Sequence, residues 1–373
     1  MWVCKDVESG QALATKEVLV DRDEHRTNMA LRELITMYGV EHPGVVTCHN
    51  VFYASNSFHI VMEFMDGGSL LDAMKRWVSY DNTYSMPPRA LAKIASDVLY
   101  GLEFLHDQLQ VVHRDVKPGN ILLDRRGEAK LADLGIVTRP GQVQVDPAAS
   151  TNPAHPCSPS DSTPGAETPA VEWIGTMTYM SPERLTGDAY SFSADIWSLG
   201  VVLIEAAIGR YPLTELGLDG GKLQFWDLLD LVKNGENPAN LLRDYGSDWV
   251  SLQALASRCL AKDQLDRPRA SQLLDASFPG VVAGGGDFFL NMVAVHGKSV
   301  LAQWVDDSLV RGEADTLRLP VAQTAMSCYA MSARRPGEGA HMFDASVYIA
   351  GGAVSELQAG LVEESGLEED GWL

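Results

Sequence analysis

The sequence predicts an α+β protein with a small β-rich lobe over residues 1–65, a large helical lobe over residues 66–280 and a C-terminal extension over residues 281–373. Three observations support this prediction. Short apolar runs typical of strands surround a single helical pattern in the first segment. Apolar residues recur at helical spacing through the second segment. A glycine run, Gly284 to Gly286, indicates a linker at the start of the third.

The small lobe contains a lysine on a predicted strand and a glutamate on a predicted helix. The run Ala12–Lys16 alternates as a short strand does, and it ends in the lysine. Glu33 lies inside Leu31–Ile35, which is part of an apolar-periodic helix. The run Glu63–Met65 then marks the connection to the large lobe.

The large lobe is predicted to be mainly helical. The clearest pattern is the single apolar stripe over Ala90–His106. Further helices are predicted around Asp195, over Phe225–Val232 and over Trp249–Leu260. Extra residues between Lys75 and Pro88, with Trp77, Tyr80 and Tyr84, are interpreted as a surface loop, with a partner-binding patch as the alternative.

A predicted hairpin brings two polar residues together. The apolar runs Ile121–Asp124 and Ala129–Ala132 flank Arg-Arg-Gly-Glu, which is a hairpin signal. Asn120 precedes the first strand and Asp133 follows the second. Both side chains are therefore expected at strand ends beside one cleft, where an amide and a carboxylate could hold Mg²⁺.

The segment His113–Asn120 supplies three groups that phosphoryl transfer needs. Asp115 can accept the proton of an attacking hydroxyl, and Lys117 can neutralise the travelling phosphoryl group. Asn120 can hold a magnesium ion. Taken singly, such residues are solvated charges or turn residues, and Asp133-Leu134-Gly135 alone indicates only a turn. Their order and spacing together argue against a chance match.

These motifs resemble those of protein kinases. Asp133-Leu134-Gly135 matches the family's Asp-Phe-Gly motif with Leu for Phe, and the resemblance continues through Gly175–Arg184. It implies that Lys16 pairs with Glu33 and that Glu183 pairs with Arg267. It further implies that Thr176 hydrogen-bonds the catalytic aspartate and lysine, and that Asp195 anchors the catalytic loop. It also implies ATP and Mg²⁺ as cofactors, with an ATP site formed by Val3, Ala14, Lys16, Glu33, Glu63, Met65 and Leu122.

Several segments are similar to mitogen-activated protein kinase kinases in particular. They are Met65–Leu70, Lys117–Leu122, Tyr179–Arg184 and Ala207–Pro212, and the similarity covers roughly residues 3–278. This implies a dual-specificity kinase that phosphorylates Thr and Tyr of a downstream mitogen-activated protein kinase and that is itself activated by an upstream kinase. A Ser/Thr kinase of another branch is the alternative.

The sequence departs from the kinase pattern at its beginning. Counting back from Lys16, Val3 falls where the valine that closes the Gly-rich loop belongs, and Met1 occupies the last glycine position. We therefore expect the first strand and the loop to be missing and ATP to bind weakly. Three accounts remain open: a truncated gene model or fragment, a short isoform, and a pseudokinase that acts as a scaffold.

The activation segment, Asp133 to Glu183, contains an insert over residues 139–170 that is rich in Pro, Ser, Thr and Ala. Such a composition predicts disorder. In the family, phosphorylatable residues lie three and seven positions before Gly175; here these are Glu172 and Thr168. A fixed carboxylate at Glu172 could partly mimic a phosphate, with activity tuned by Thr168. The alternative is a solvated loop charge.

Composition excludes several classes of protein. The formal charge of −21 argues against a nucleic-acid binder, and the hydrophobic content of 46% argues against global disorder. The five cysteines are dispersed, which favours reduced thiols in the cytosol. No apolar run reaches membrane length. We expect a cytoplasmic protein with access to the nucleus, and no membrane or nucleic-acid partner.

The C-terminal extension carries one helical pattern. Val300, Leu301, Trp304, Val305 and Leu309 fall at helical spacing, and an acidic tail ends the chain. The pattern is compatible with a small appended module or with a tail that packs on the large lobe.

Overall fold

The computed structural model describes residues 1–7, 9–19, 40–54, 57–81, 84, 86–133, 177–215, 225–275 and 287–313. The predicted helix around Glu33, the insert 139–170 with Thr168, and the residues Glu172 and Thr176 lie outside the described residues.

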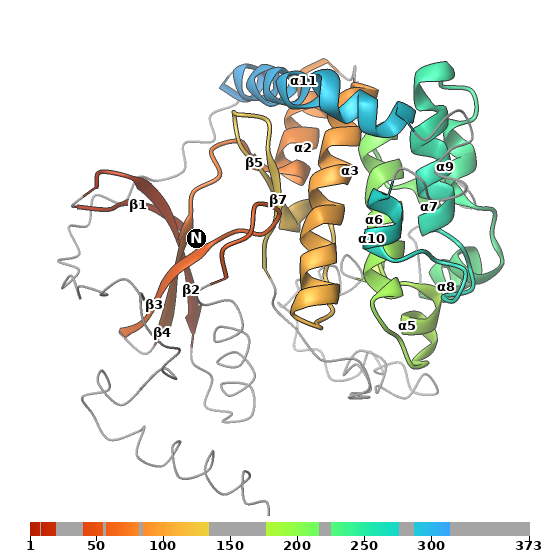
Figure 1. The fold of residues 1–373 in the computed structure, drawn as a ribbon, viewed down its shortest axis with the longest axis horizontal. Coiled ribbons are helices and arrows are strands. Elements are labelled where there is room, and N and C mark those ends of the chain that lie inside the picture. The colour runs from red at the N-terminus through yellow and green to blue at the C-terminus, as the bar shows by residue number, and fades with distance from the viewer. Residues whose placement is uncertain are drawn as a thin grey trace, which may run out of the picture. The chain divides into compact units, whose positions relative to one another are not determined.

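Within the described residues, the predicted α+β architecture is confirmed (Figure 1). The strands are β1 (Trp2–Lys5), β2 (Ala12–Leu19), β3 (Cys48–Ala54), β4 (Ser57–Glu63), β5 (Gly68–Ser69), β6 (Ile121–Leu123) and β7 (Ala129–Leu131). The helices are α2 (Leu70–Asp81), α3 (Pro88–Glu103), α5 (Pro182–Thr186), α6 (Ser193–Ile208), α7 (Pro212–Glu215), α8 (Phe225–Asn234), α9 (Val250–Cys259), α10 (Ala270–Leu274) and α11 (Asp287–Glu313).

The small lobe contains an antiparallel sheet in the order β1-β2-β4-β3. Ala14 on β2 faces Val3 on one side and Met62 on the other, and both Ala14 and Met62 are buried. Side chains two residues apart on a strand share a face. Lys16 therefore projects from the same face of β2 as Ala14.

A short connection ties the strand before Asp133 to the rest of the fold. The Val46 N–H donates to the Leu131 carbonyl at 2.8 Å, and the Leu131 N–H donates to the Gly44 carbonyl at 2.9 Å. Gly44 packs against Gly101 of α3 so closely that a β-carbon at Gly101 would lie 2.5 Å from the Gly44 oxygen. Any larger residue at Gly101 would push β7, and Asp133 after it, away from α3.

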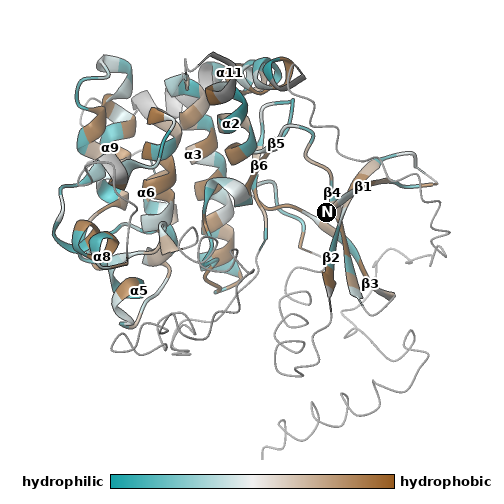
Figure 2. Cartoon of the chain, turned by 180° about the vertical axis from the view of Figure 1, so that it is seen from behind, coloured by the Kyte–Doolittle hydropathy of each residue, from teal (hydrophilic) through white to brown (hydrophobic). Residues whose placement is uncertain are grey.

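The large lobe is built around α3 and α6. Every residue of α6 from Ala194 to Ala207 is buried, which identifies α6 as the central helix. Hydrophobic residues follow α3 and α6 in Figure 2. The helices predicted around Asp195, over Phe225–Val232 and over Trp249–Leu260 are α6, α8 and α9. The Ala90–His106 pattern forms α3 and then a π-helical turn over Phe104–Gln108. The predicted hairpin also forms, as β6 paired antiparallel with β7.

The interpretation of residues between Lys75 and Pro88 as a surface loop is wrong for residues 76–81 and for Tyr84. Helix α2 continues to Asp81, and Trp77 on it is buried. The Trp77 ring stacks on Trp304 of α11, with ring centres 5.9 Å apart. The Tyr84 hydroxyl donates to the carbonyl of Ala206 in α6. These aromatic side chains are held inside the fold because α11 and α6 cover them.

Helix α11, from the C-terminal extension, packs on α3 and α2 and crosses over one end of both (Figure 1). Leu301, Trp304 and Val305 of α11 are buried, in agreement with the predicted stripe. Arg76 donates to the Gly67 carbonyl at 2.7 Å and to Ser308 Oγ at 3.2 Å, which joins α11 to the segment after β4. No described helix is long and apolar enough to cross a membrane.

We predict that Trp304→Ala destabilises the protein strongly, by about 3–5 kcal/mol, because it removes a buried ring from the α2–α11 contact. Val310→Ala on the same helix is the control, since Val310 is 70% exposed and should change stability by less than about 0.5 kcal/mol. Urea unfolding of the two variants measures the difference. Equal midpoints would show that α11 does not contribute to the stability of the large lobe.

Candidate active site

Asp195, in the first turn of α6, binds the backbone of the segment His113–Asn120. Asp195 is 1% exposed, and its carboxylate accepts the N–H groups of His113 at 2.7 Å and Arg114 at 2.8 Å. His106 Nε2 lies 2.8 Å from the same carboxylate. These contacts fix the backbone immediately before Asp115, as expected for an anchor of the loop.

The charge states of this anchor follow from its surroundings. Burial opposes ionisation of Asp195, but the hydrogen bonds from His106 and from the His113 N–H outweigh this effect and hold the pKa of Asp195 below the ordinary value. Burial lowers the pKa of His113, so its ring is neutral. A neutral ring can accept the Asp115 N–H at Nδ1 (3.3 Å) and donate from Nε2 to the Ala132 carbonyl (3.2 Å). His113 thus links the loop to the residue before Asp133.

Two residues of the site have left-handed backbone. Arg114 has φ 70° and Asp133 has φ 62°. This conformation costs a non-glycine residue roughly 1–2 kcal/mol, so surrounding contacts must maintain it. Strained backbone of this kind gathers at functional sites. Here it lies directly before Asp115 and at Asp133.

The side chains of Asp115, Lys117 and Asn120 converge. Lys117 Nζ lies 2.7 Å from Asp115 Oδ2, and Asn120 Nδ2 donates to the same oxygen at 2.8 Å. Asn120 Nδ2 also donates to the Asp115 carbonyl at 2.9 Å. Asp115 therefore has a fixed orientation. Its side chain is 23% exposed, so a substrate can reach the carboxylate.

Asp133 contacts the lysine of β2. Lys16 Nζ lies 2.6 Å from Asp133 Oδ1, and both side chains are partly exposed. The expected pairing of Lys16 with Glu33 falls outside the described residues. The Ala132 N–H donates to the Asn120 carbonyl at 2.8 Å, which keeps Asn120 and Asp133 at adjoining strand ends as the hairpin predicts.

An amide oxygen and a carboxylate fit Mg²⁺, which prefers oxygen ligands and completes its shell with water and phosphate oxygens. Because Asn120 Nδ2 is engaged with Asp115, the amide oxygen is the atom that could ligate a cation. Asp133 would supply the carboxylate. Within the described ranges, no group of three or more His, Cys, Asp or Glu side chains forms a separate metal site.

The described residues expected around ATP lie on the small-lobe sheet, on the segment after β4 and on β6. Val3 and Ala14 are register partners, Met65 is buried after β4, and Leu122 is half-buried on β6. The Glu63 carboxylate bonds Lys130 at 2.7 Å and accepts the Thr47 N–H, also at 2.7 Å. Its side chain is thus occupied, and any contact of Glu63 with a nucleotide would come from its backbone.

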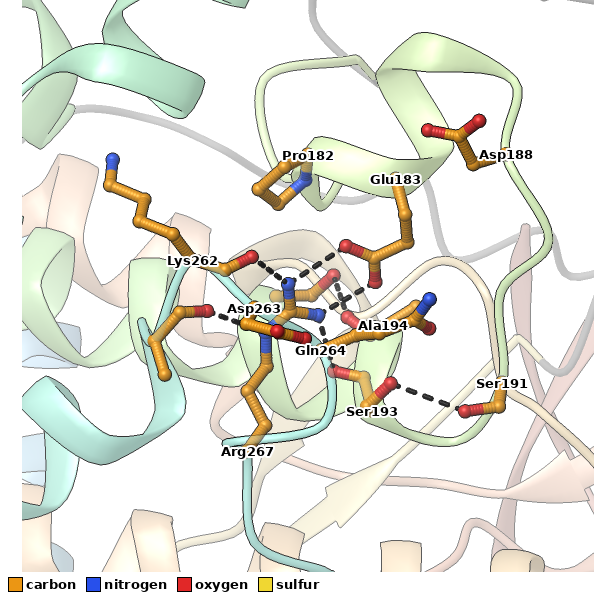
Figure 3. A network of polar contacts seen from close by, with 12 residues as sticks. Pro182, Glu183, Asp188, Ser191, Ser193, Ala194, Lys262, Asp263, Gln264 and Arg267 are labelled. Carbon is orange, nitrogen blue, oxygen red and sulfur yellow. Dashed lines mark hydrogen bonds and ion pairs between the residues drawn. The ribbon is translucent and has the colours of Figure 1, made fainter.

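Glu183 and Arg267 form a buried ion pair (Figure 3). The two N–H···O distances are 2.6 and 2.8 Å, and Arg267 also donates to the carbonyls of Ser193, Ala261 and Lys262. A buried charge pair is stable only when its remaining donors are satisfied, as they are here. The pair fixes α5, which carries Glu183, to α6 and to the loop after α9.

A polar cluster that the sequence did not predict joins the segment before α5 to α6 and to Tyr211. The Tyr179 hydroxyl donates to Glu205 at 2.6 Å, and the Tyr211 hydroxyl donates to the Thr178 carbonyl at 2.5 Å. Burial raises the pKa of Glu205 to about 7, against the bond from Tyr179, which lowers it. A single glutamate inside the apolar run of α6 was the signal that could have identified the cluster.

We predict that Glu205→Gln changes the pH dependence of stability. Because its pKa is raised in the folded protein, protonated Glu205 contributes its full share of stability below about pH 4.5, and this contribution is lost as the pH rises through about 7. The stability of Glu205→Gln relative to the unmodified protein should therefore increase between pH 5 and 8, by up to about 3 kcal/mol. Thermal unfolding at both pH values measures it. The exposed-site control Glu236→Gln should show no such increase, and a constant difference for Glu205→Gln would contradict the prediction.

Comparison with known proteins places the chain in a family. The protein kinase domain model matches residues 2–279. The chain is 31% identical over 268 residues to mitogen-activated protein kinase kinase 1 of Arabidopsis thaliana and 32% identical over 270 residues to the mitogen-activated protein kinase kinase SIPKK of Nicotiana tabacum. Each alignment covers 72% of this chain and 67% of the relative.

A third relative is matched over less of its length. Over 204 residues the chain is 41% identical to dual specificity mitogen-activated protein kinase kinase 1 of Dictyostelium discoideum, which is 55% of this chain and 26% of that protein. The chain thus spans about a quarter of this relative and about two thirds of the two plant proteins. The chain belongs to the protein kinase domain family, among the mitogen-activated protein kinase kinases.

Proposed function

We propose that the chain is an ATP-dependent protein kinase that phosphorylates Thr and Tyr of a downstream mitogen-activated protein kinase. The observation that carries the proposal is the convergence of Lys117 and Asn120 on the Asp115 carboxylate, within a loop whose backbone is fixed by buried Asp195. Phosphoryl transfer depends mainly on positioning and charge, and this loop supplies both.

Each group has a role that its contacts support. Asp115 would orient the attacking hydroxyl of the substrate and accept its proton. Lys117, 2.7 Å from Asp115, would place positive charge beside the transferred group. Asn120 would hold Asp115 in the orientation seen here through its amide nitrogen.

ATP and Mg²⁺ are the cofactors that the site would take. Asp133 and the amide oxygen of Asn120 would hold the ion, which when bound neutralises charge on the phosphates. Lys16 would exchange its contact with Asp133 for the α- and β-phosphates. That exchange is feasible because the Lys16–Asp133 pair is partly exposed, and pairs of this kind contribute little to stability.

The similarity to named relatives supports the proposed substrate and the proposed activation by phosphorylation. Because relatives are named as mitogen-activated protein kinase kinases, one of them as dual specificity, we assign a mitogen-activated protein kinase as substrate and an upstream kinase as activator. Phosphorylation would fall on Thr168, with Glu172 as a fixed negative charge nearby in the sequence. We place the protein in the cytoplasm, with access to the nucleus.

We predict that Asp115→Asn abolishes phosphoryl transfer, with a loss of at least about 10²-fold in kcat, because the amide cannot accept the substrate proton. The full chain is assayed with Mg·ATP and a catalytically inactive mitogen-activated protein kinase, and mass spectrometry identifies the modified residues. Asp107→Asn, an exposed position, is the control and should retain activity. Absence of transfer by the unmodified chain, or equal activity of the two variants, would refute the proposed reaction.

We further predict that Glu172→Ala lowers basal activity of the unphosphorylated chain, because it removes the charge that substitutes for a phosphate. The decrease should be modest, since one carboxylate carries less charge than a phosphate. Glu167→Ala, five residues earlier in the same segment, provides the comparison. Identical basal rates for the two variants would assign Glu172 to a solvated loop charge.

A further inference from the structure

We propose that Arg184, the residue after Glu183, is a positioning residue for the catalytic loop. Its side chain is buried at 6% exposure, and its Nη1 donates to the carbonyl oxygen of Arg114 at 2.5 Å. Arg114 immediately precedes Asp115. Arg184 ends the family-like motif Tyr179–Arg184, but the sequence alone assigns it no role.

The bond matters because of the conformation of Arg114. This residue is held at φ 70°, which is unfavourable for any residue other than glycine. Its N–H is bound by Asp195 of α6 at 2.8 Å, and its carbonyl is bound by Arg184 of α5. Both backbone polar groups of the strained residue are therefore held by buried, oppositely charged side chains. Charge-assisted bonds of this kind are stronger than neutral ones.

A tyrosine fixes the orientation of the arginine. The guanidinium groups of Arg114 and Arg184 each lie 5.3 Å from the centre of the Tyr190 ring. A ring face attracts a cation at this distance, so Tyr190 holds two guanidinium groups that would otherwise repel each other. Tyr190 lies on the segment between α5, which carries Arg184, and α6, which carries Asp195.

The other end of the connection is the buried ion pair. Arg267 binds Glu183 through two hydrogen bonds, and Glu183 is the neighbour of Arg184 on α5. Because α5 cannot shift without breaking this pair, the backbone position from which the Arg184 side chain extends is fixed. The contacts run from Arg267 through Glu183 and Arg184 to the Arg114 carbonyl, and so to Asp115. The end of the activation segment and the catalytic base are thereby joined by direct contacts.

The kinetic consequence of this connection rests on the proposed kinase function, whereas the structural consequence does not. Without Arg184 the Arg114 carbonyl loses a buried partner, so the peptide before Asp115 can rotate. A displacement of about 1 Å at a reacting group can cost roughly 10²-fold in rate. Nucleotide binding involves other residues, so KM for ATP should stay unchanged.

The test compares Arg184→Met and Arg184→Lys with Arg243→Met in the full chain, since Arg243 is exposed and undergoes the same chemical change. Hydrogen exchange followed by mass spectrometry measures protection of the segment 110–117 against that of α3 and α6. The expected result for Arg184→Met is faster exchange confined to 110–117, with Arg184→Lys intermediate because it keeps one charged donor. In the activity assay, kcat should fall about 10²-fold with KM for ATP unchanged.

Exchange of 110–117 equal to that of Arg243→Met, or a change in KM without a change in kcat, would overturn the proposal. If Arg184→Met fails to fold, Arg184→Lys decides by the same two measurements. If the unmodified chain has no kinase activity, the proposed function fails, but the exchange measurement still tests the role of Arg184.

Discussion

The rest of the site depends on the Asp195 carboxylate, buried at the start of α6. Removing an ionised carboxylate from water costs several kcal/mol, so it is retained only where hydrogen bonds compensate. Here the backbone N–H groups of His113 and Arg114 and the ring of His106 supply them. The same bonds that stabilise the charge also hold Arg114 in its unfavourable conformation. The order of the catalytic loop is thus a consequence of satisfying one buried charge.

The surrounding contacts divide into fixed and exchangeable ones. Buried pairs such as Glu183–Arg267, together with the close packing of Gly44 on Gly101, set the positions of α5 and of the strand before Asp133. The Lys16–Asp133 pair, by contrast, is partly exposed, and in the proposed reaction Lys16 would contact the phosphates while Asp133 would hold the ion. Catalysis by positioning requires this division, because the base must be in place beforehand while the phosphate ligands must be free to change partners.

Much of the site could be predicted because its residues are close in sequence or lie in motifs of fixed order. Asp115, Lys117 and Asn120 share one loop, and the β6–β7 hairpin brings Asn120 to Asp133. The stack of Trp77 on Trp304 could not be predicted, because no local pattern relates side chains that far apart in the chain. Arg184 was missed for another reason: its partner is a backbone carbonyl, which leaves no signature in the sequence.

We expect the backbone of the loop that Asp195 holds to keep this arrangement when Mg²⁺ and ATP are bound. The most direct measurement is a crystal structure of the full chain with Mg²⁺ and a non-hydrolysable ATP analogue. We expect that Asn120 and Asp133 bind the ion, that Lys16 leaves Asp133 for the phosphates, and that His113–Lys117 keeps its present backbone. A nucleotide bound elsewhere, or a catalytic loop rearranged on binding, would contradict it.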